Sequence, residues 1–224
     1  MFPSIIFLGA ASASREFFWY FHETYPEAPI AFADDYTSKS ENIIGGVSYP
    51  IVKDWDFSGL RKRYPHIRGA FTEFLIGVAD PPIKRVLVEK ALAHGLRPAP
   101  SFITTCSKVR PDCTLGRGGI IVDTLYSSGA VLGDYLLSMF CTYGSDVRVR
   151  DYVTTYTGCH VASDVLLEEG VCLGASTTVK ERVRIAPWCV TGQSASVVKS
   201  VTEEGITLVG VPARKLERSS SSLT

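Results

Sequence analysis

Residues 161–185 read VASDVLLEEGVCLGASTTVKERVRI, and this stretch decides the fold. Every sixth residue in it is apolar: Val161, Leu167, Leu173, Val179 and Ile185. Neither an α-helix, with a period of about 3.6 residues, nor a strand, with a period of about two, gives this spacing. A sustained six-residue repeat is typical of a parallel β-helix, in which each hexad forms one face of a triangular coil. Three hexads, or about 18 residues, then complete one turn.

The same spacing extends through much of the second half of the chain. One frame runs in steps of six from Leu125 to Val197, and every residue in it is apolar or threonine. A second frame, four residues later in each unit, runs from Gly129 to Ala195 and is mostly small or β-branched. We expect both frames to point inward and to stack on residues one coil away, which would bury a continuous core.

The cysteines fit this frame. There are six, with no C-x-x-C pair, so we expect neither a zinc site nor a thioredoxin-type motif, and no metal. Three of them fall in the second, small frame, namely Cys141, Cys159 and Cys189. Free cysteine behaves as a small hydrophobic residue, so we expect these thiols to fill the core; a catalytic or metal-binding role is the alternative.

The first hundred residues alternate between strand-like and helix-like segments, which predicts a small Rossmann-like parallel α/β sheet. The expected strands are Ser4–Gly9, Ile30–Ala33 and Phe74–Val78, and the expected helices are Ser14–His22 and Pro82–His94. Arg97–Pro100 is interpreted as a linker. The predicted domains are therefore residues 1–100, the β-helix at 101–216, and a disordered tail at 217–224.

Composition excludes several classes of function. The 224 residues include 23 Lys and Arg and 23 Asp and Glu, so there is no net charge to attract nucleic acid. Hydrophobic residues make up 46% of the chain, which excludes a disordered protein. No apolar run is long enough to cross a bilayer, and Ile5–Leu8 is too short for the core of a signal peptide. We expect a cytoplasmic protein with neither membrane nor nucleic acid as partner.

Four stretches carry a resemblance to a known family: Val165–Ser176 (VLLEEGVCLGAS), Val209–Lys215 (VGVPARK), Ile6–Ser12 (IFLGAAS) and the pair Asp34-Asp35. The first two resemble left-handed β-helix acyltransferases. The other two are similar to the sialic acid O-acetyltransferases and bacillosamine N-acetyltransferases of the NeuD/PglD group. The resemblance implies a left-handed coil, a homotrimer, acetyl-CoA as donor and a sugar or nucleotide sugar as acceptor, with CoA between adjacent helices.

The chain departs from this family at the general base. The family has a histidine followed by an acidic residue where this chain has Ser145 and Asp146, and a further histidine is replaced by Ala13. The only histidine in the repeat region is His160. Ser145 is expected to stack on Ser163, roughly 10 Å along the strand from His160.

The candidate catalytic residues are therefore Asp146, Ser145 and His160. Asp146 is expected to act as a weak base or to orient an amine; a solvated loop residue is the alternative. Ser145 is expected only to orient a substrate or a water. His160 is expected to point outward, either without a role or into a site shared with a neighbouring protomer.

The missing histidine favours an amine as acceptor. A hydroxyl is a weak nucleophile without a base, whereas a neutral amine has a lone pair and loses its proton only after attack. We therefore expect acetyl transfer from acetyl-CoA to an amino group of a sugar or nucleotide-linked sugar. A sugar O-acetyltransferase is one alternative, and a catalytically degenerate trimer that binds ligands or acts as a scaffold is another.

The resemblance also implies a donor site. It places the pantetheine and the thioester against the backbone of successive coils and the close-approach residues of the GVPA ending. These positions are Ala162, Ser163, Ala175, Gln193, Gly210, Pro212 and Ala213. Arg214 and Lys215 would meet the phosphates of CoA as charge-assisted partners; a solvated cationic tail is the alternative.

The first domain provides a candidate acceptor site. A single glycine replaces the G-x-G-x-x-G fingerprint, which does not support a dinucleotide site. The serines that follow suit a phosphate cradle or a helix cap, and the paired aspartates suit hydrogen bonds to a ribose or base, or else a turn. The residues expected to line this crevice are Gly9, Ser12, Ser14, Asp34, Asp35 and Gly77.

Overall fold

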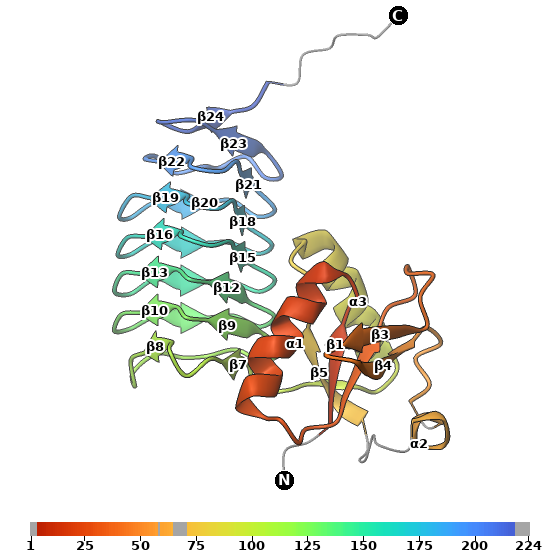
Figure 1. Cartoon of the computed structure of the whole chain (residues 1–224). Helices are drawn as coiled ribbons and strands as arrows, with labels where there is room; N and C mark the ends of the chain where they lie inside the picture. The colour runs from red at the N-terminus through yellow and green to blue at the C-terminus, as the bar shows by residue number, and fades with distance from the viewer. Residues whose placement is uncertain (1–3, 58, 65–70, 218–224) are drawn as a thin grey trace, which may run out of the picture.

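The computed structural model describes residues 4–57, 59–64 and 71–217, and it divides the chain into two connected parts (Figure 1). The N-terminal part is an α/β unit, and the remainder winds into a three-sided β-helix. Of the tail predicted at 217–224, only Glu217 lies within the described residues.

The N-terminal unit is built on one six-stranded sheet, with the strand order β3-β4-β2-β1-β5-β6. The pairs are parallel except for β3 and β4, which are antiparallel. The strands are β1 Ser4–Leu8, β2 Ile30–Ala33, β3 Glu41–Ile44, β4 Val47–Val52, β5 Phe71–Ile76 and β6 Arg97–Pro98, and the helices are α1 Ser12–Thr24, α2 Leu60–Arg63 and α3 Pro81–Ala93.

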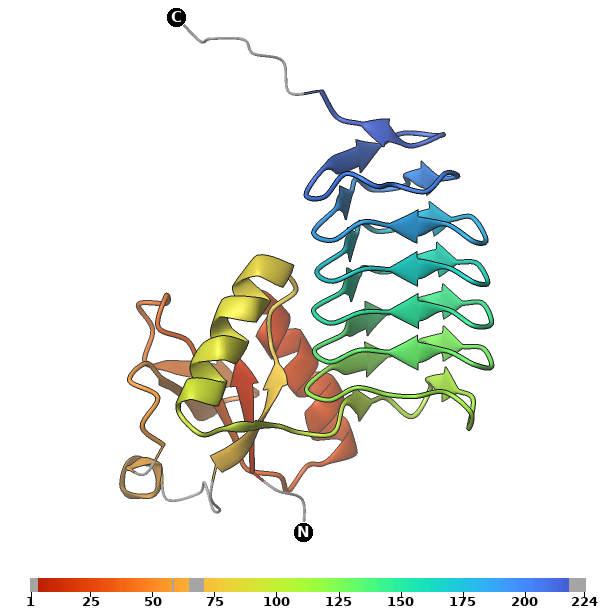
Figure 2. The same cartoon turned by 180° about the vertical axis from the view of Figure 1, so that it is seen from behind.

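The two long helices cover opposite faces of this sheet. Helix α1 lies in front of the strands in Figure 1, and α3 lies in front of them in Figure 2. From β1 the chain continues through α1 to β2 on one side, and from β5 it continues through α3 to β6 on the other. The carboxyl ends of β1 and β5 therefore flank a topological switch point, the usual position of a ligand crevice in such sheets.

The predicted strands and helices of this unit are confirmed to within a few residues, with two differences. A hairpin of β3 and β4 was not predicted, although its two-residue Gly45-Gly46 turn is a typical hairpin signal. Arg97–Pro100 is not a free linker, as was interpreted, because Arg97 and Pro98 pair with β5 as an edge strand. A sheet edge tolerates the missing N–H of a proline.

The β-helix stacks its short strands into three parallel sheets that form the sides of a prism. One sheet has the order β22-β19-β16-β13-β10-β8, a second β11-β14-β17-β20, and a third β24-β23-β21-β18-β15-β12-β9-β7, in which only the β23–β24 pair is antiparallel. The strands are β7 Phe102–Ile103, β8 Lys108–Val109, β9 Ile120–Val122, β10 Leu125–Tyr126, β11 Val131–Leu132, β12 Leu137–Met139, β13 Thr142–Tyr143, β14 Arg148–Val149, β15 Thr154–Thr155, β16 His160–Val161, β17 Leu166–Leu167, β18 Cys172–Leu173, β19 Thr178–Val179, β20 Arg184–Ile185, β21 Val190–Thr191, β22 Ser196–Val197, β23 Thr207–Val209 and β24 Arg214–Lys215.

The predicted 18-residue coil is confirmed from β13 to β22, where Thr142 pairs with His160 and Thr178 with Ser196. In the last coil the spacing is shorter, since Val190 pairs with Thr207. Below β13 the repeat is one residue shorter, since Leu125 pairs with Thr142. The frame that placed Leu125 and Val131 inside is therefore wrong there. Val131 is 44% exposed, and its neighbour Leu132 is buried instead.

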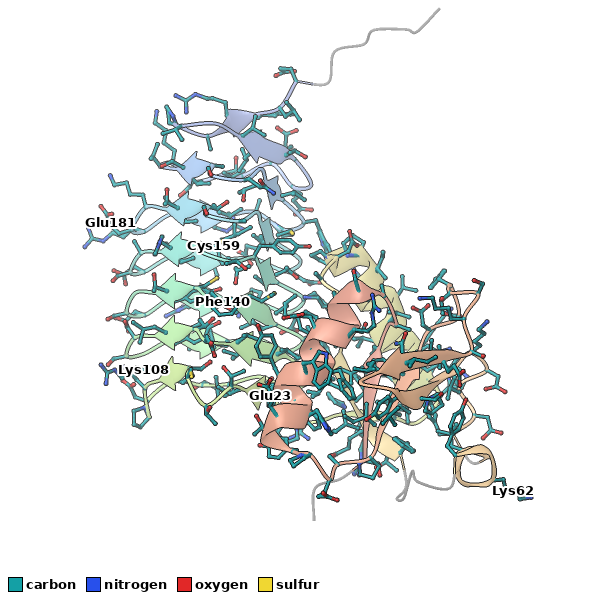
Figure 3. All side chains as sticks on the ribbon, in the orientation of Figure 1. Glu23, Lys62, Lys108, Phe140, Cys159 and Glu181 are labelled. Carbon is teal, nitrogen blue, oxygen red and sulfur yellow. The ribbon has the colours of Figure 1, made fainter. Side chains whose placement is uncertain are left out.

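From Cys141 upward the interior of the prism is filled as the second frame predicted. Below it the frame is wrong, because Gly129 and Tyr135 are corner residues and their neighbours Ala130 and Leu136 are buried inside. Cys141, Cys159 and Cys189 are buried and free, which confirms them as core residues. Figure 3 shows the labelled Cys159 within the β-helix, while Lys108 and Glu181 lie on the side away from the N-terminal unit. Buried free thiols among Val and Leu side chains act here as small hydrophobic packing groups.

The N-terminal unit packs on the outer face of the β7–β24 sheet. Ile120, Val122 and Leu137 from that face belong to the same apolar core as the strands of the α/β sheet. Phe74 of β5 stacks on Tyr135 with ring centroids 6.1 Å apart. The two parts therefore share a continuous core, which fixes one against the other.

Within the part of the chain that the structure describes, no helix has both the length and the apolar character needed to cross a membrane.

The corner glycine Gly170 gives a test of coil stacking. It has a φ of +66°, and a Cβ there would lie 2.2 Å from Cε3 of Trp188 on the next coil. We expect Gly170→Ala to lower the free energy of unfolding by about 1–3 kcal/mol more than Gly205→Ala does, as overpacking typically costs that much. Gly205 also has a positive φ, +68°, but open space around it.

Urea unfolding of the two variants measures this difference at a common m-value. Equal losses would mean that only backbone strain is felt at these corners, and that contact with Trp188 contributes nothing.

Candidate active site

The candidate residues fall into two groups on opposite sides of the molecule. The corner after β13, with Ser145 and Asp146, lies on the side of the prism away from the N-terminal unit (Figure 1). The α/β crevice, with Gly9 and Gly77, lies on the other side. One chain therefore does not bring the two groups together.

The corner after β13 presents a carboxylate and a hydroxyl. Asp146 has a left-handed φ of 60°, which turns the chain from one face of the prism to the next, and its side chain is exposed. Its Oδ1 lies against Gly129 of the coil below, and a Cβ added at Gly129 would be only 2.2 Å from this oxygen. Ser145 stacks on Ser163 as predicted, because its N–H donates to Ser163 Oγ at 3.2 Å.

His160 lies on the outer face of the β-helix, as predicted, in strand β16. It stacks between Thr142 and Thr178 of the neighbouring coils. The Oγ1 of Thr142 lies 2.7 Å from His160 Nδ1, so this contact fixes the ring and leaves Nε2 for another partner. His160 has no contact with Ser145 in its own chain.

The predicted donor positions lie at the two corners that flank the sheet containing His160. The N–H groups of Ser163, Ala175 and Gln193 have no hydrogen-bond partner among the described residues, so they are available to a ligand. The Ala162 N–H is not available, contrary to expectation, because it donates to Val179 O in the coil ladder. Ala162 can offer a ligand only its carbonyl.

The GVPA ending is a strand rather than a tail. Arg214 and Lys215 form β24, which pairs antiparallel with β23, so they do not belong to a free tail, although both side chains are exposed. Lys215 donates to Glu203, and this hydrogen bond raises the pKa of its ammonium. Arg214 is exposed and unpaired among the described salt bridges. Gly210, Pro212 and Ala213 form the turn between the two strands.

The α/β crevice is closely packed at its base. Gly9 is buried at the end of β1, and Gly77 follows β5. A Cβ at Gly77 would lie 2.6 Å from Leu8 O, so only glycine permits this approach of the two strand ends. The buried Ser14 donates its hydroxyl to Gly77 O at 2.7 Å. That hydroxyl is therefore not available to a phosphate, contrary to the prediction.

Ser12 is exposed at the start of α1 and keeps its predicted place at the crevice. Neither serine caps the helix, because the cap position is Ala11 and no side-chain cap hydrogen bond forms. Beside Ser12 a hollow of about 400 Å³ opens between α1 and β3, lined in part by Arg15, Trp19 and the carboxylate of Glu16. A cation at a helix start suits an anionic ligand.

Asp34 and Asp35 are both held by protein groups. Asp34 accepts hydrogen bonds from the N–H of Ala10 at 2.8 Å and of Tyr36 at 2.9 Å. The bond from Tyr36 closes a local turn, and a turn was the alternative to ligand binding that we considered for Asp34. Asp35 pairs with Lys90 of α3.

Helix α3 carries a buried lysine that the sequence interpretation missed. Lys84 Nζ donates to the carbonyls of Tyr135, Tyr152 and Val153 at 3.1, 3.2 and 3.0 Å, and to Thr154 Oγ1 at 2.8 Å. The available signal was its position on the apolar stripe of α3, among Pro81, Leu87, Val88 and Ala91.

Among the described residues, no group of three or more His, Cys, Asp or Glu side chains is arranged to hold a metal ion.

Comparison with known proteins places this geometry in context. No family model matches the chain. The GDP-perosamine N-acetyltransferase of Escherichia coli O157:H7 is 28% identical over 156 residues, which are 67% of this chain and 70% of that protein. A mutant of perosamine N-acetyltransferase from Caulobacter crescentus, in complex with CoA and GDP-perosamine, superposes with a TM-score of 0.81 at 18% identity. The match covers 97% of this chain and 99% of that one.

The chain shares the fold of this acetyltransferase. A further acetyltransferase, the PglB domain of Neisseria gonorrhoeae FA1090 in complex with acetyl coenzyme A, gives a TM-score of 0.75 at 21% identity over 96% of this chain and 99% of that one. The predicted fold, a small Rossmann-like sheet followed by a left-handed β-helix, is confirmed.

Lys84 gives the stability of this fold a specific pH dependence. Burial lowers the pKa of its ammonium to about 7, against partial opposition from Cys172 and Asp80. Between that value and about 10.5 the unfolded chain holds one proton more than the native chain, so stability rises with pH in this window. We expect the free energy of unfolding to rise relative to Lys84→Met by up to about 1.4 kcal/mol per pH unit.

Urea titrations of both proteins from pH 7.5 to 9.5 measure this slope. A difference that does not change with pH would show that Lys84 keeps its proton in the native state.

Proposed function

We propose that this chain is an acetyl-CoA-dependent N-acetyltransferase that acts on an amino group of a nucleotide-linked sugar. One observation carries the proposal. The fold superposes over 97% of the chain on an acetyltransferase structure that holds both CoA and GDP-perosamine. The relative from Escherichia coli O157:H7 is named as a GDP-perosamine N-acetyltransferase, and its sequence is similar over 67% of this chain. The structural match covers both the N-terminal unit and the β-helix, which supports the proposal that one holds the acceptor and the other the donor.

We further propose a homotrimer with each active site shared by two protomers. The acidic corner and the α/β crevice lie on opposite sides of one chain, so a complete site needs a second copy. A ring of three chains repeats one head-to-tail contact, and this contact can place the corner of one protomer beside the crevice of the next. The six free cysteines are compatible with a reducing compartment, and we place the trimer in the cytoplasm.

The chemistry needs only a modest contribution from the protein. The amine nitrogen forms a bond to the thioester carbon as the carbon–sulfur bond breaks, giving an amide and the free thiol of CoA. The attacking amine must lose one proton, and the thiolate must gain one. Because the amine loses its proton only after attack, a base of low strength is sufficient.

Asp146 and His160 are proposed to manage that proton. The exposed Asp146 carboxylate accepts a hydrogen bond from the amine and orients its lone pair, while Ser145 holds a substrate hydroxyl or a water. His160 is oriented by Thr142 at 2.7 Å, and its free Nε2 takes the proton in the cleft between protomers. The acceptor nucleotide is proposed to lie over Ser12 and the adjacent hollow.

The donor fits the same side of the prism. The unpaired N–H groups of Ser163, Ala175 and Gln193 can bind the carbonyls of the pantetheine and the thioester. Donors aimed at the thioester oxygen stabilise the charge that develops there during attack. Arg214 is the cation of the GVPA strand that remains free for a phosphate.

A thiol-release assay tests the proposed activity and its residues. With acetyl-CoA and GDP-perosamine or another nucleotide amino sugar, we expect free thiol and an N-acetylated product. Asp146→Asn and His160→Gln are each expected to lower kcat/KM by about 100-fold, the lower end of the range for a positioned acid or base. Glu23→Gln, exposed near the end of α1 and away from both groups of candidate residues, is expected to have no effect.

Two outcomes would contradict this assignment. Acetylation of hydroxyl sugars without any activity on amines would favour the O-acetyltransferase alternative. Binding of CoA and nucleotide sugar without thiol release from any acceptor would favour the ligand-binding or scaffolding trimer.

A mixing experiment tests the shared site. Ser12→Glu places a carboxylate where the acceptor phosphates are proposed to bind, yet it suits a helix start, so the fold is retained. Asp146→Asn disables the other half. Each variant alone should be weakly active, but trimers refolded from an equal mixture should regain up to about a quarter of the wild-type rate, since some interfaces combine two intact halves.

The control is a mixture of the two variants without refolding, which keeps their trimers separate. No gain after refolding would place both halves of the site within one protomer, or would show that the protein is not an oligomer of this kind.

A further inference from the structure

The loop between β5 and α3, residues 77–80, is tied to the protein on both sides. On one side, Ser14 of α1 donates to Gly77 O at 2.7 Å, and Gly77 N–H donates to Leu8 O at the same distance. On the other side, Thr154 of the β-helix donates its hydroxyl to Ala79 O at 2.6 Å. This loop forms the wall of the crevice at the switch point, and the β-helix holds one end of it.

Thr154 is itself held by Lys84. A hydroxyl has one hydrogen to donate, and Thr154 gives it to Ala79 O, so its oxygen accepts from Lys84 Nζ at 2.8 Å. Both side chains are fully buried. The hydrogen bonds therefore run in one direction, from the ammonium through the hydroxyl to the loop carbonyl.

The shape of the coil corners explains why a lysine occupies this position. Tyr135 and Tyr152 have left-handed φ values of 60° and 62° at stacked corners. Their carbonyls turn out of the coil ladder and accept from no backbone N–H among the described residues. An ammonium has three N–H donors, and here they face four acceptors: these two carbonyls, Val153 O and Thr154 Oγ1, so one N–H is shared between two of them. Lys84 thus fixes α3 at a definite height on the prism.

We propose that Thr154, held by Lys84, is a positioning residue for the acceptor: it sets the 77–80 loop, and through it the crevice in which the nucleotide sugar binds. This inference rests on the proposed function for the identity of the ligand. Thr154 touches neither donor nor acceptor in its own right. It acts through Ala79, whereas the donor positions on the neighbouring sheet do not depend on it.

A pair of substitutions at one position gives the test. Thr154→Val keeps the shape and removes the hydroxyl, while Thr154→Ser restores it. We expect Thr154→Val to raise KM for GDP-perosamine about 10-fold with KM for acetyl-CoA unchanged, which corresponds to the loss of about one hydrogen bond. Thr154→Ser should return KM to within about twofold of the wild type, since its hydroxyl can make the same bonds.

Hydrogen exchange followed by mass spectrometry gives a second measurement that needs no activity. Peptides covering residues 77–84 should exchange faster in Thr154→Val than in the wild type and in Thr154→Ser, because loss of the tie lowers the local opening free energy. If Thr154→Val does not fold, Lys84→Arg, which keeps a cation and lengthens the side chain, takes its place with the same expected changes in KM and exchange.

The matched control is Ser101→Ala. Ser101 also bridges two backbone groups near the base of the β-helix, donating to Gly116 O and accepting from Gly119 N–H, but it does not touch the loop. It should lower stability without changing the KM for the acceptor. A similar rise in that KM for Ser101→Ala, or unchanged exchange of residues 77–84 in Thr154→Val, would overturn the positioning role. An inactive wild type with altered exchange in Thr154→Val would instead overturn the proposed function alone.

Discussion

The structure depends on the backbone ladder between successive coils of the β-helix. Each strand of two or three residues is too short to be stable alone, but it pairs with the coil above and the coil below. A side chain on the prism is therefore held at a height set by the coil to which it belongs. His160 lies directly over Thr142 for this reason, and Ser163 over Ser145. The candidate chemistry is arranged by this repeat rather than by loops that can adjust.

That repeat made the β-helix predictable from the sequence. It also explains which coils were assigned the wrong inward residues. A residue at every sixth position faces the same way only while each face has six residues. Val161 through Ile185 obey the rule, and the inward cysteines followed from it. The rule fails below β13, where Leu137 and Thr142 are one step short of a full face, so Leu132 is buried and Val131 exposed. The hydrophobic pattern alone does not reveal that one corner is a residue shorter. The pairing of the coils does.

The site was predictable only in part. The outward position of His160 and the stacking of Ser145 follow from the frame. The engagement of Ser14 with Gly77 and the role of Lys84 do not, because both depend on how two parts of the chain meet. A lysine on an apolar stripe signals an unusual burial but not its acceptors, which come from coils some 50–70 residues later in the chain. Likewise, the hydrogen bond from the Ala162 N–H to Val179 O follows only from the pairing of the coils.

The shared core between the two parts has a consequence for the molecule as a whole. Ile120, Val122 and Leu137 point out of the prism, yet they are covered because the α/β unit sits on them. A β-helix expressed by itself would expose this apolar surface to solvent and would be prone to self-association. The N-terminal unit thus also covers this apolar surface of the β-helix, and neither part can be exchanged between proteins without redesigning the interface between them.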